Sequence, residues 1–394
     1  MLPVVQGNCA SIPGFFNAHS HAFQRAIRGR TEHPSTAAAD SFWTWREAMY
    51  RAANRLQPED VYAVSRMAFM EMLLAGITTV CEFHYLHHAP DGTSYADPNL
   101  LAHEVIRAAN DAGIRIVLMR TAYERAGWRK PENPLQRRFL FRSVDSFLAE
   151  TEDLIASAGV PLGIALHSVR ALRLESIQAI TAFARSRTLP IHMHVAEQPA
   201  EIEQCLAEHR TRPIELLQQH GILGTDFTAV HAIHITPREA GYLGAVHASV
   251  CACPTTERNL GDGPVPADVL LQAGANLCFG TDSNAQIDLL EDARSLEYHL
   301  RMKHLQRAVL PIDALRRGLI PDERNGDRVT IDLSDPSLAG NANADLMEQL
   351  VFAADKRAIK EVSIGGKVVV SNGRHVRQDE IVEAFENVQL RLWR

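Results

Sequence analysis

Residues 58–83 read PEDVYAVSRMAFMEMLLAGITTVCEF, and this stretch contains the unit from which the fold follows. Pro58 to Ala75 places apolar residues at helical spacing. Gly76 comes next, at the position where a glycine commonly ends a helix. Ile77 to Phe83 is a short apolar segment rich in β-branched residues, which is typical of a buried strand. The stretch therefore predicts a helix that leads directly into a strand.

The same alternation recurs along the chain, and counting the segments gives eight strand–helix units. Gly113 and Gly274 again separate helical runs from the strands that follow. Eight parallel units with right-handed crossovers favour a closed barrel over an open sheet. We predict an α/β fold with a (β/α)8 TIM barrel over residues 11–320. The expected strands are Phe15 to His19, Ile77 to Phe83, Ile114 to Arg120, Leu162 to Leu166, Pro190 to Val195, Thr228 to Ile233, Ala248 to Cys253 and Asn276 to Gly280, and the other expected helices include Asn99 to Ala112, Val144 to Ser157, Leu174 to Arg187 and Leu289 to His304.

The alternation of strand-like and helical segments ends after Pro311. Val329 to Leu333 and Lys360 to Asn372 are strand-like, and Gly365-Gly366 inside the second segment predicts a tight hairpin. Glu380 to Trp393 is expected to be a helix or a frayed tail. Residues 1–10 and 321–394 are thus expected to form a small β module with a C-terminal helix.

The overall composition excludes several classes of protein. Of the 394 residues, 46% are hydrophobic and 22% are charged, which is ordinary for a globular chain with a sizeable core. The net charge of -7 argues against a nucleic-acid partner, because the basic residues are scattered and outnumbered. No apolar run is long enough for a membrane span and no secretory leader is evident, so we expect a cytoplasmic protein.

The six cysteines form no CxxC pair and are expected to be reduced thiols. Cys251 and Cys253 alternate on an expected strand and could together bind a metal. We favour core thiols, because the chain has no matching second pair of cysteines.

The strongest local motif is Asn17-Ala-His19-Ser-His21, at the carboxyl end of the first expected strand. Residues two apart on a strand project to one face, so two imidazoles can share one metal. Barrel active sites are built at these carboxyl strand ends. Alone, an HxH motif is more often two incidental polar residues.

Polar residues occupy the same position on other strands, and this changes the interpretation. His194 ends the fifth strand, His231 ends the sixth, and Asp282 follows the eighth. Imidazole nitrogens and a carboxylate in a tetrahedral set are the ligands of a catalytic Zn²⁺, with Fe²⁺ as the alternative. His192 and His194 share one face of their strand, so spacing does not choose between them.

Three residues around such a metal could carry chemistry. A metal there would activate water as the nucleophile, and Asp282 could take up its proton. Glu197, just beyond His194, could protonate a substrate nitrogen, although a glutamate at a strand end can also be a surface residue. His231 would hydrogen-bond the attacking oxygen or the tetrahedral centre, and its alternative is a satisfied core histidine.

Seven sequence blocks together resemble the N-formimino-L-glutamate deiminases, bacterial histidine-degradation enzymes of the amidohydrolase superfamily. The resemblance spans roughly residues 12–300, and HSHAFQR, EFHYLHH and HVAEQ are more restrictive than the HxH shared by the superfamily. It implies zinc as the metal, His194 as the ligand of the fifth strand and Glu197 as the proton-transfer residue. The blocks are His19–Arg25 (HSHAFQR), Phe42–Arg46 (FWTWR), Glu82–His88 (EFHYLHH), His167–Arg170 (HSVR), His194–Gln198 (HVAEQ), Cys253–Glu257 (CPTTE) and Asn259–Gly263 (NLGDG).

The same resemblance assigns five residues to substrate binding, namely Gln24, Arg46, Tyr85, His167 and Arg170. Two guanidinium groups suit a dianionic glutamate moiety. Taken singly, Arg46 could be a cation on a helix surface and Tyr85 a core aromatic residue. His84, His87 and His88 are assigned to loop packing.

The chain also departs from the family pattern. Only 18 residues precede His19, where the family carries several strands of a β-sandwich, so that module is expected to be incomplete or rebuilt. The stretch Leu315 to Val329 is short. Asn284 stands where the family has a histidine, two residues after the aspartate ligand.

The leading hypothesis is hydrolysis of N-formimino-L-glutamate to N-formyl-L-glutamate and ammonia, by a cytoplasmic homodimer with one zinc per chain. One alternative is a metal-dependent deaminase of another amidine-like, purine, pterin or triazine substrate. The other is a homologue that binds a ligand without turnover.

Overall fold

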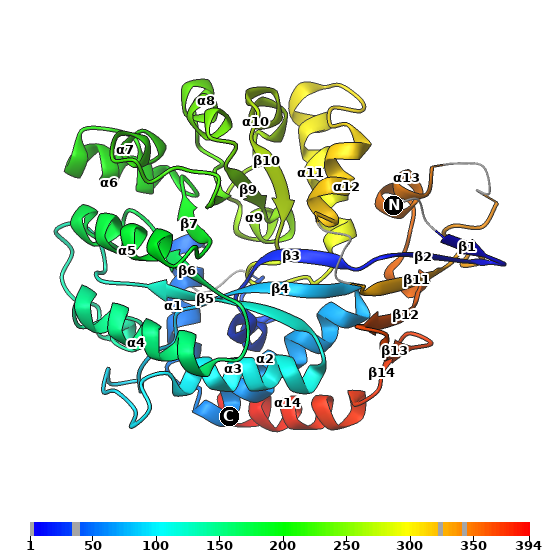
Figure 1. The fold of residues 1–394 in the computed structure, drawn as a ribbon, viewed down its shortest axis with the longest axis horizontal. Coiled ribbons are helices and arrows are strands. Elements are labelled where there is room, and N and C mark those ends of the chain that lie inside the picture. The colour runs from blue at the N-terminus through cyan, green and yellow to red at the C-terminus, as the bar shows by residue number, and fades with distance from the viewer. Residues whose placement is uncertain (1–3, 34–39, 322–325, 341–344) are drawn as a thin grey trace.

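The computed structural model describes residues 4–33, 40–321, 326–340 and 345–394. Eight parallel strands form a nearly closed barrel, in the order β10-β9-β8-β7-β6-β5-β4-β3 (Figure 1). The predicted TIM barrel is therefore confirmed. The strands are β3 (Phe15–Ser20), β4 (Ile77–His84), β5 (Arg115–Ala122), β6 (Leu162–Leu166), β7 (Ile191–Val195), β8 (Phe227–His231), β9 (Ser249–Ala252) and β10 (Asn276–Phe279).

Several strand ends differ from the predicted ones for reasons of backbone geometry. β7 begins at Ile191 and leaves out Pro190, which has no N–H to donate to a neighbouring strand. β8 ends at His231 instead of Ile233, because His231 and Ala232 have φ values of 71° and 50°. A positive φ turns the chain out of the extended conformation, so the strand stops there.

The barrel closes between its first and last strands. Ser20 pairs with Asp282 in a single parallel bridge. The backbone N–H of Asp282 donates to the carbonyl of His19 at 3.0 Å, and that of His21 donates to the carbonyl of Asp282 at 2.8 Å. Gly280 permits this approach, since a Cβ there would lie 2.7 Å from that of His19. The seam therefore brings the HxH motif and Asp282 together.

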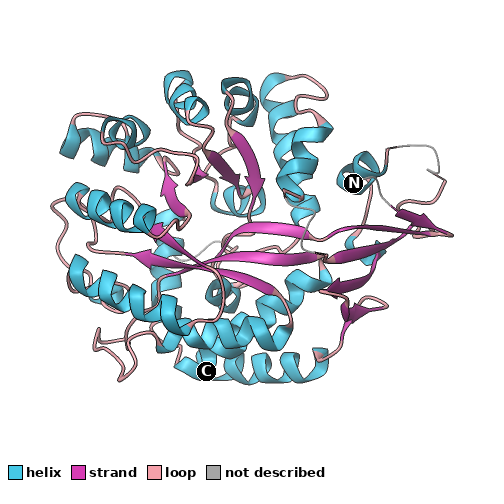
Figure 2. Ribbon diagram, in the orientation of Figure 1, coloured by secondary structure: helices cyan, strands magenta, loops and turns pink. Residues whose placement is uncertain are grey.

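Helices cover the outside of the barrel (Figure 2). Gly76, at φ +76°, joins α2 to β4 as the sequence predicts. The helices are α1 (Phe42–Ala53), α2 (Pro58–Leu74), α3 (Leu100–Ala112), α4 (Val144–Ser157), α5 (Leu174–Ser186), α6 (Pro199–His209), α7 (Pro213–Gln219), α8 (Pro237–Ala245), α9 (Pro254–Leu260), α10 (Ala267–Ala273), α11 (Leu289–His304), α12 (Ile312–Leu319), α13 (Leu346–Phe352) and α14 (Gln378–Leu392), with short 3-10 helices η1 (Ala22–Ile27), η2 (Pro134–Gln136) and η3 (Lys356–Ala358). None of the helices in the described part of the chain is long and apolar enough to cross a membrane.

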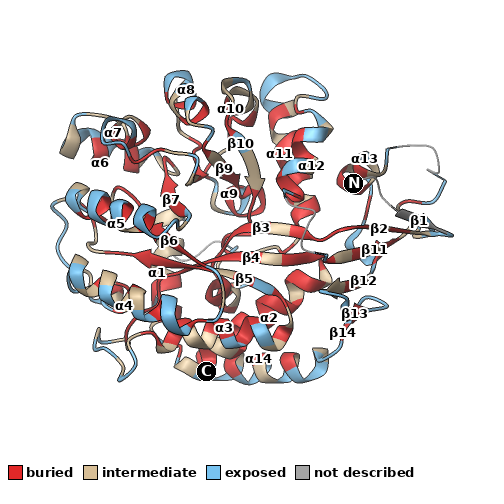
Figure 3. Ribbon diagram, in the orientation of Figure 1, coloured by how far each residue is buried: buried red, intermediate tan, exposed pale blue. Residues whose placement is uncertain are grey.

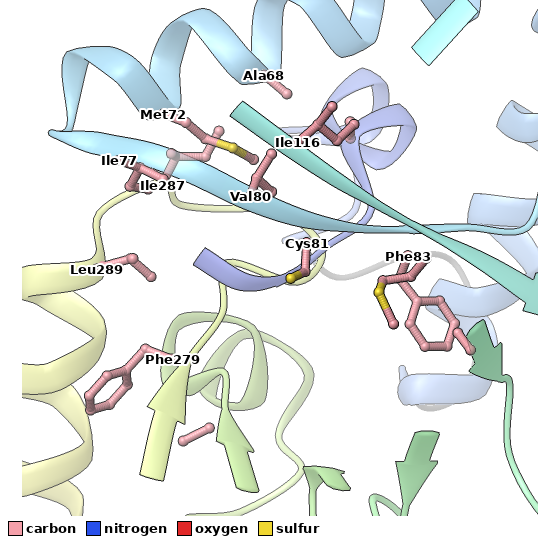
Figure 4. Packing of buried hydrophobic residues seen from close by; sticks show 14 of the residues in the cluster. Ala68, Met72, Ile77, Val80, Cys81, Phe83, Ile116, Phe279, Ile287 and Leu289 are labelled. Atoms are coloured by element: carbon pink, nitrogen blue, oxygen red, sulfur yellow. The ribbon is translucent and has the colours of Figure 1, made fainter. Parts of the chain in front are cut away.

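The core lies between the strands and the inner faces of these helices (Figure 3). Ala68 and Met72 of α2 pack beside Val80 of β4 and Ile116 of β5 (Figure 4). Parallel strands buried on both faces read as continuous apolar runs, which is why the eight strands were recognisable in the sequence.

The two ends of the chain build a second, antiparallel sheet with the order β1-β2-β11-β12-β13-β14. The N-terminal segment contributes two strands, and β2 pairs with β11 so that Ile12 lies opposite Val329. Gly365 and Gly366 join β12 to β13 in the predicted hairpin. The expected boundary between residues 10 and 11 falls inside β2. The strands are β1 (Val4–Gln6), β2 (Cys9–Pro13), β11 (Arg328–Asp332), β12 (Ile359–Ile364), β13 (Lys367–Ser371) and β14 (Arg374–His375).

Candidate active site

Four buried side chains meet at the carboxyl end of the barrel, and they are the four proposed metal ligands: His19, His21, His194 and Asp282. The Nε2 atom of His194 lies 3.0 Å from that of His19 and 3.3 Å from that of His21. Oδ1 of Asp282 lies 3.3 Å from the Nε2 atoms of both His19 and His21. The structure therefore gathers the four donor atoms around one point.

The second nitrogen of two of these imidazoles faces a backbone carbonyl. Nδ1 of His21 lies 3.0 Å from the carbonyl of Phe83, and Nδ1 of His194 lies 3.1 Å from that of His167. Each Nδ1–H donates to its carbonyl, which leaves the Nε2 lone pairs directed at one another. Burial lowers the pKa of His21 to about 3 and that of His194 well below its ordinary value, so the rings are neutral.

This donor set fits a divalent metal. Lone pairs that face each other cannot hydrogen-bond, and only a cation can satisfy them all. In a tetrahedral site with bonds of about 2.0–2.1 Å, donor atoms lie about 3.3 Å apart, close to the spacing found here. Burial would raise the pKa of Asp282, but its contacts with His19, His231 and His21 hold it well below its usual range. Three neutral imidazoles and one carboxylate form a set that zinc accepts.

The structure also separates the two histidines of β7. His194 belongs to the group of four, whereas His192 lies outside it although both residues are buried. His192 is two residues earlier on the strand, which places it one layer deeper in the barrel. Its Nδ1 has no hydrogen-bond partner among the described residues, and burial lowers its pKa to about 3.

Glu197 and His231 lie next to the four converging side chains. Nε2 of His231 is 3.7 Å from a carboxylate oxygen of Glu197 and 3.7 Å from Oδ2 of Asp282. Burial raises the pKa of Glu197 to about 7, although the charge of His231 opposes the rise. A carboxyl with this pKa can both give and take a proton near neutral pH.

Glu257 was not singled out by sequence reasoning, although it ends the CPTTE block. Its Oε1 lies 3.2 Å from Nδ1 of His231 and accepts a hydrogen bond from the backbone N–H of Cys253 at 2.8 Å. Burial alone would lower the pKa of His231, but the charge of Glu197, the hydrogen bond to Glu257 and the charge of Asp282 raise it to about 10. The ring is therefore held with Nε2 facing Glu197 and Asp282.

Backbone strain concentrates at this end of the barrel. Ala196, His231, Asp282 and Asn284 have φ values of 55°, 71°, 45° and 56°. Residues other than glycine seldom adopt this conformation, and such positions gather at functional sites. The chain therefore turns sharply where these strands end, and two of the four residues, His231 and Asp282, line one cavity.

All five predicted substrate-binding residues line that cavity, together with Glu197, His231 and three of the four proposed ligands. Gln24 lies on η1, Arg46 on α1, and Tyr85, His167 and Arg170 follow barrel strands. The amide of Gln24 donates to the hydroxyl of Tyr85 at 3.0 Å, and Nδ1 of His167 lies 3.1 Å from the hydroxyl of Ser168. The structure therefore brings the predicted set together at one mouth.

Two guanidinium groups of the cavity have buried nitrogens without a bonding partner. Nε and Nη1 of Arg46 and Nη1 of Arg170 have no hydrogen-bond partner among the described residues. Arg46 also stacks over the ring of Trp43, with 4.5 Å between its Cζ and the ring centroid. Buried cations with free donors are the expected partners of a bound anion.

Asn284 takes no part in lining the cavity. Its Oδ1 accepts a hydrogen bond from the hydroxyl of Thr281 at 2.7 Å, and its Nδ2 donates to the hydroxyl of Ser20 at 3.1 Å. Asn17 bonds both the backbone and the side chain of Thr281, at 3.1 and 2.8 Å. These buried residues tie the loop that carries Asp282 to β3.

The three histidines assigned to loop packing, and the cysteines, lie outside the group of four converging side chains. His87 and His88 place Nε2 2.8 and 3.0 Å from the carbonyls of Thr121 and Leu140, and His84 is buried beside them. All six cysteines are free thiols. The sulfur atoms of Cys251 and Cys253 lie 3.9 Å apart.

Known proteins resemble this chain over almost its whole length. The model of the amidohydrolase family matches residues 11–369. A formimidoylglutamate deiminase from Pseudomonas aeruginosa is 36% identical over 96% of this chain and 88% of its own. A solved amidohydrolase from Brucella melitensis has a TM-score of 0.90 and 31% identity, covering 100% of this chain and 96% of that one.

A solved adenosine deaminase from Xanthomonas campestris, with bound zinc, has the same fold at a TM-score of 0.82 and 21% identity, covering 98% of this chain and 86% of that one. The family match, the barrel and the carboxyl-end site agree. This chain belongs to the amidohydrolase family and is a hydrolase that acts on carbon–nitrogen bonds.

Proposed function

We propose that the protein hydrolyses N-formimino-L-glutamate to N-formyl-L-glutamate and ammonia. The observation that carries the proposal is the pair of guanidinium groups with unpartnered nitrogens, Arg46 and Arg170, in the same cavity as the four converging metal donors. A dianionic substrate needs such a pair, whereas a neutral base does not. The 36% identity to a formimidoylglutamate deiminase supports the same substrate.

His19, His21, His194 and Asp282 would hold the metal, which we propose to be zinc, with Fe²⁺ as the alternative. When bound, the metal supplies Lewis acidity that activates a water molecule for attack on the formimino carbon. The protein supplies neutral imidazoles for this purpose, because burial keeps all three histidines unprotonated.

The carboxyl groups of Asp282 and Glu197 carry out the proton transfers. Asp282 is ionised and takes the proton from the attacking water. Glu197, with its pKa near 7, gives one proton to the formimino nitrogen and is reprotonated by the proton that Asp282 took up. The hydroxyl proton of the tetrahedral centre passes to the same nitrogen, which departs as ammonia while the carbonyl of the formyl group forms. The reaction consumes one water, breaks the bond between the formimino carbon and its terminal nitrogen, and leaves a formyl group. His231 stabilises the developing negative charge on oxygen as a hydrogen-bond donor.

The glutamate part of the substrate is held farther out in the cavity. Arg46 and Arg170 form the carboxylate-binding part of the cavity, and Gln24, Tyr85 and His167 fix the formimino end. Gln24 keeps Oε1 free of any partner in the described chain, so it can accept a hydrogen bond from a substrate N–H. Orientation by several contacts of this kind is a large part of a hydrolase's rate.

A ring-shaped amidine such as a purine is the second candidate, because Phe42, Trp43 and Trp45 also line the cavity. Against it stand the unpartnered arginines, which a neutral ring would leave buried and unsatisfied. The expected homodimer and the cytoplasmic location stay predictions.

The test is ammonia release by the zinc-loaded protein from N-formimino-L-glutamate, a guanidino acid and adenosine, compared by kcat/KM. We expect the formimino acid to exceed the others by at least about 100-fold. Glu197→Gln is expected to lose activity by roughly 100- to 10,000-fold while keeping one metal per chain. Preference for adenosine would sink the substrate assignment. A wild-type chain with well under one metal would favour a binding protein without turnover.

A further inference from the structure

Two buried tyrosines share hydrogen bonds at the base of the arginine pair. The hydroxyls of Tyr50 on α1 and Tyr123 after β5 lie 3.1 Å apart. Nε2 of Gln136, in η2, donates to both of them, at 2.9 Å to Tyr50 and 2.6 Å to Tyr123. All three side chains are at most 1% exposed. The proposed mechanism uses none of them.

In this group of three side chains, one phenol O–H has no hydrogen-bond acceptor. The amide of Gln136 uses both of its N–H groups, so each phenol oxygen already accepts one hydrogen bond. The two phenols carry two protons, and only one of these can lie between the two oxygens. Oε1 of Gln136 is the remaining acceptor of the group, but it has no hydrogen-bond partner among the described residues, so the other phenol proton has no acceptor within reach.

The surroundings decide which proton is left over. Tyr123 is fully buried and does not line the cavity, and among the described residues the acceptor within reach of its hydroxyl is the oxygen of Tyr50. A buried hydroxyl donates where it can, so Tyr123 donates to Tyr50. Tyr50 lines the cavity, and its own proton is then directed there.

The free proton lies next to the two cations. Cζ of Arg46 is 5.5 Å from the ring centroid of Tyr50, and both side chains line the cavity with Arg170. Arg46 and Arg170 have unpartnered nitrogens at the same place. A neutral hydroxyl donor in the same cavity as two guanidinium groups matches a carboxylate, which accepts up to about four hydrogen bonds.

We propose that Tyr50 is a substrate-contacting, specificity-determining residue, whose hydroxyl donates to a carboxylate held by Arg46 and Arg170 while Tyr123 and Gln136 fix its direction. The ligand class is a dicarboxylate with a three-carbon spacer. The inference rests on the proposed function for its biological substrate, but the subsite itself can be tested without turnover.

The experiment measures glutarate binding to the metal-loaded protein by calorimetry. Glutarate has the two carboxylates and no formimino group, so it reports on the subsite alone. Tyr50→Phe is expected to weaken glutarate binding by about 10- to 100-fold, the range for a hydrogen bond to a charged group. Tyr62→Phe, which removes a hydroxyl bonded to Asp111 on the outside of the barrel, is the matched control and is expected to bind as the wild type does.

Tyr123→Phe tests whether Tyr50 has only a structural role. This variant removes the other phenol hydroxyl of the same buried hydrogen-bonded group. It is expected to lower the melting temperature as Tyr50→Phe does and to weaken glutarate binding clearly less than Tyr50→Phe does, because the donor hydroxyl of Tyr50 is kept although Tyr123 no longer fixes its direction or contacts Arg170. Equal losses of affinity in the two variants, an unchanged affinity in Tyr50→Phe, or no binding of glutarate by the wild type would each overturn the proposal. Ammonia release from N-formimino-L-glutamate is measured separately, so a failure of the proposed function stays distinguishable from a failure of the subsite.

Discussion

Asn284 donates a hydrogen bond from Nδ2 to the hydroxyl of Ser20 at 3.1 Å, across the seam where β3 and β10 meet. Ser20 lies between the two histidines of the HxH motif, and Asn284 lies two residues after Asp282. The same amide also bonds the carbonyl of Asp282 at 3.2 Å. This asparagine therefore joins the two segments that carry three of the four proposed metal ligands.

Removing that link should loosen the metal site. Asn284→Ala is expected to weaken zinc binding by roughly tenfold, as the loss of a hydrogen bond behind a ligand commonly does. Competition with a chromophoric chelator measures the affinity directly. Asn99→Ala, which removes a buried asparagine bonded to the carbonyl of Glu150, is the control and should leave zinc affinity unchanged. Wild-type affinity in Asn284→Ala would show that the seam does not position the ligands.

The carboxylate-binding role of Arg170 predicts a change in KM. Arg170→Met removes one cation from the cavity and is expected to raise KM for N-formimino-L-glutamate by roughly 10- to 100-fold. Steady-state ammonia release over a range of substrate concentrations measures the effect. Arg142→Met, at an exposed position, serves as the control. An unchanged KM in Arg170→Met would argue that the substrate carboxylates bind elsewhere.

Glu257 is expected to act through His231. Glu257→Gln keeps the size of the side chain but removes the charge that Nδ1 of His231 faces at 3.2 Å. We expect kcat to fall by roughly 10- to 100-fold with a smaller change in KM, because His231 is used in the transition state. Glu239→Gln offers a comparison at a glutamate that is equally buried but bonded to Arg212 away from the cavity. Loss confined to KM in Glu257→Gln would contradict this role.

One pH-dependent contribution to stability lies outside the site. Glu71 of α2 accepts hydrogen bonds from Arg25 at 2.6 Å and from Arg28 at 2.5 Å. Burial would raise its pKa, but the two arginines lower it below the ordinary value of 4.5. Because the pKa of Glu71 is lower in the folded protein than in the unfolded one, the ionised carboxylate stabilises the fold at any pH above the unfolded-state pKa. This stabilisation is lost as the pH falls through the folded-state pKa.

Glu71→Gln should therefore reduce the free energy of unfolding by about 2 kcal/mol at pH 7. The difference from wild type should shrink as the pH is lowered below about 4. Urea unfolding of wild type and variant at pH 7 and at a pH below about 4 measures this difference in free energy. Glu203→Gln, at an exposed position, is the control. A difference that does not depend on pH would mean that the arginines do not bind the ionised carboxylate.

Much of the fold could be predicted, because parallel strands buried on both faces leave runs such as Ile77 to Phe83. The strand ends were harder. The missing N–H of Pro190 is visible in the sequence and explains why β7 begins only at Ile191. The turn at His231 and Ala232, in contrast, depends on backbone angles that local composition does not carry.

The site could be predicted only as far as strand periodicity reaches. Spacing places His19 and His21 on one face, but it treats His192 and His194 alike, because the choice depends on depth in the barrel. Tyr50 and Gln136 are 86 residues apart and lie on α1 and η2. Their hydrogen bond is set by how these segments pack, and no local pattern in the sequence encodes that.

Hydrolysis in water enriched in ¹⁸O is the most direct test of the central claim, with products identified by mass spectrometry. The zinc-loaded protein should convert N-formimino-L-glutamate into equimolar ammonia and N-formyl-L-glutamate, with one solvent oxygen in the formyl group. Formation of free glutamate and formamide, or no ammonia from a protein with a full complement of metal, would contradict it.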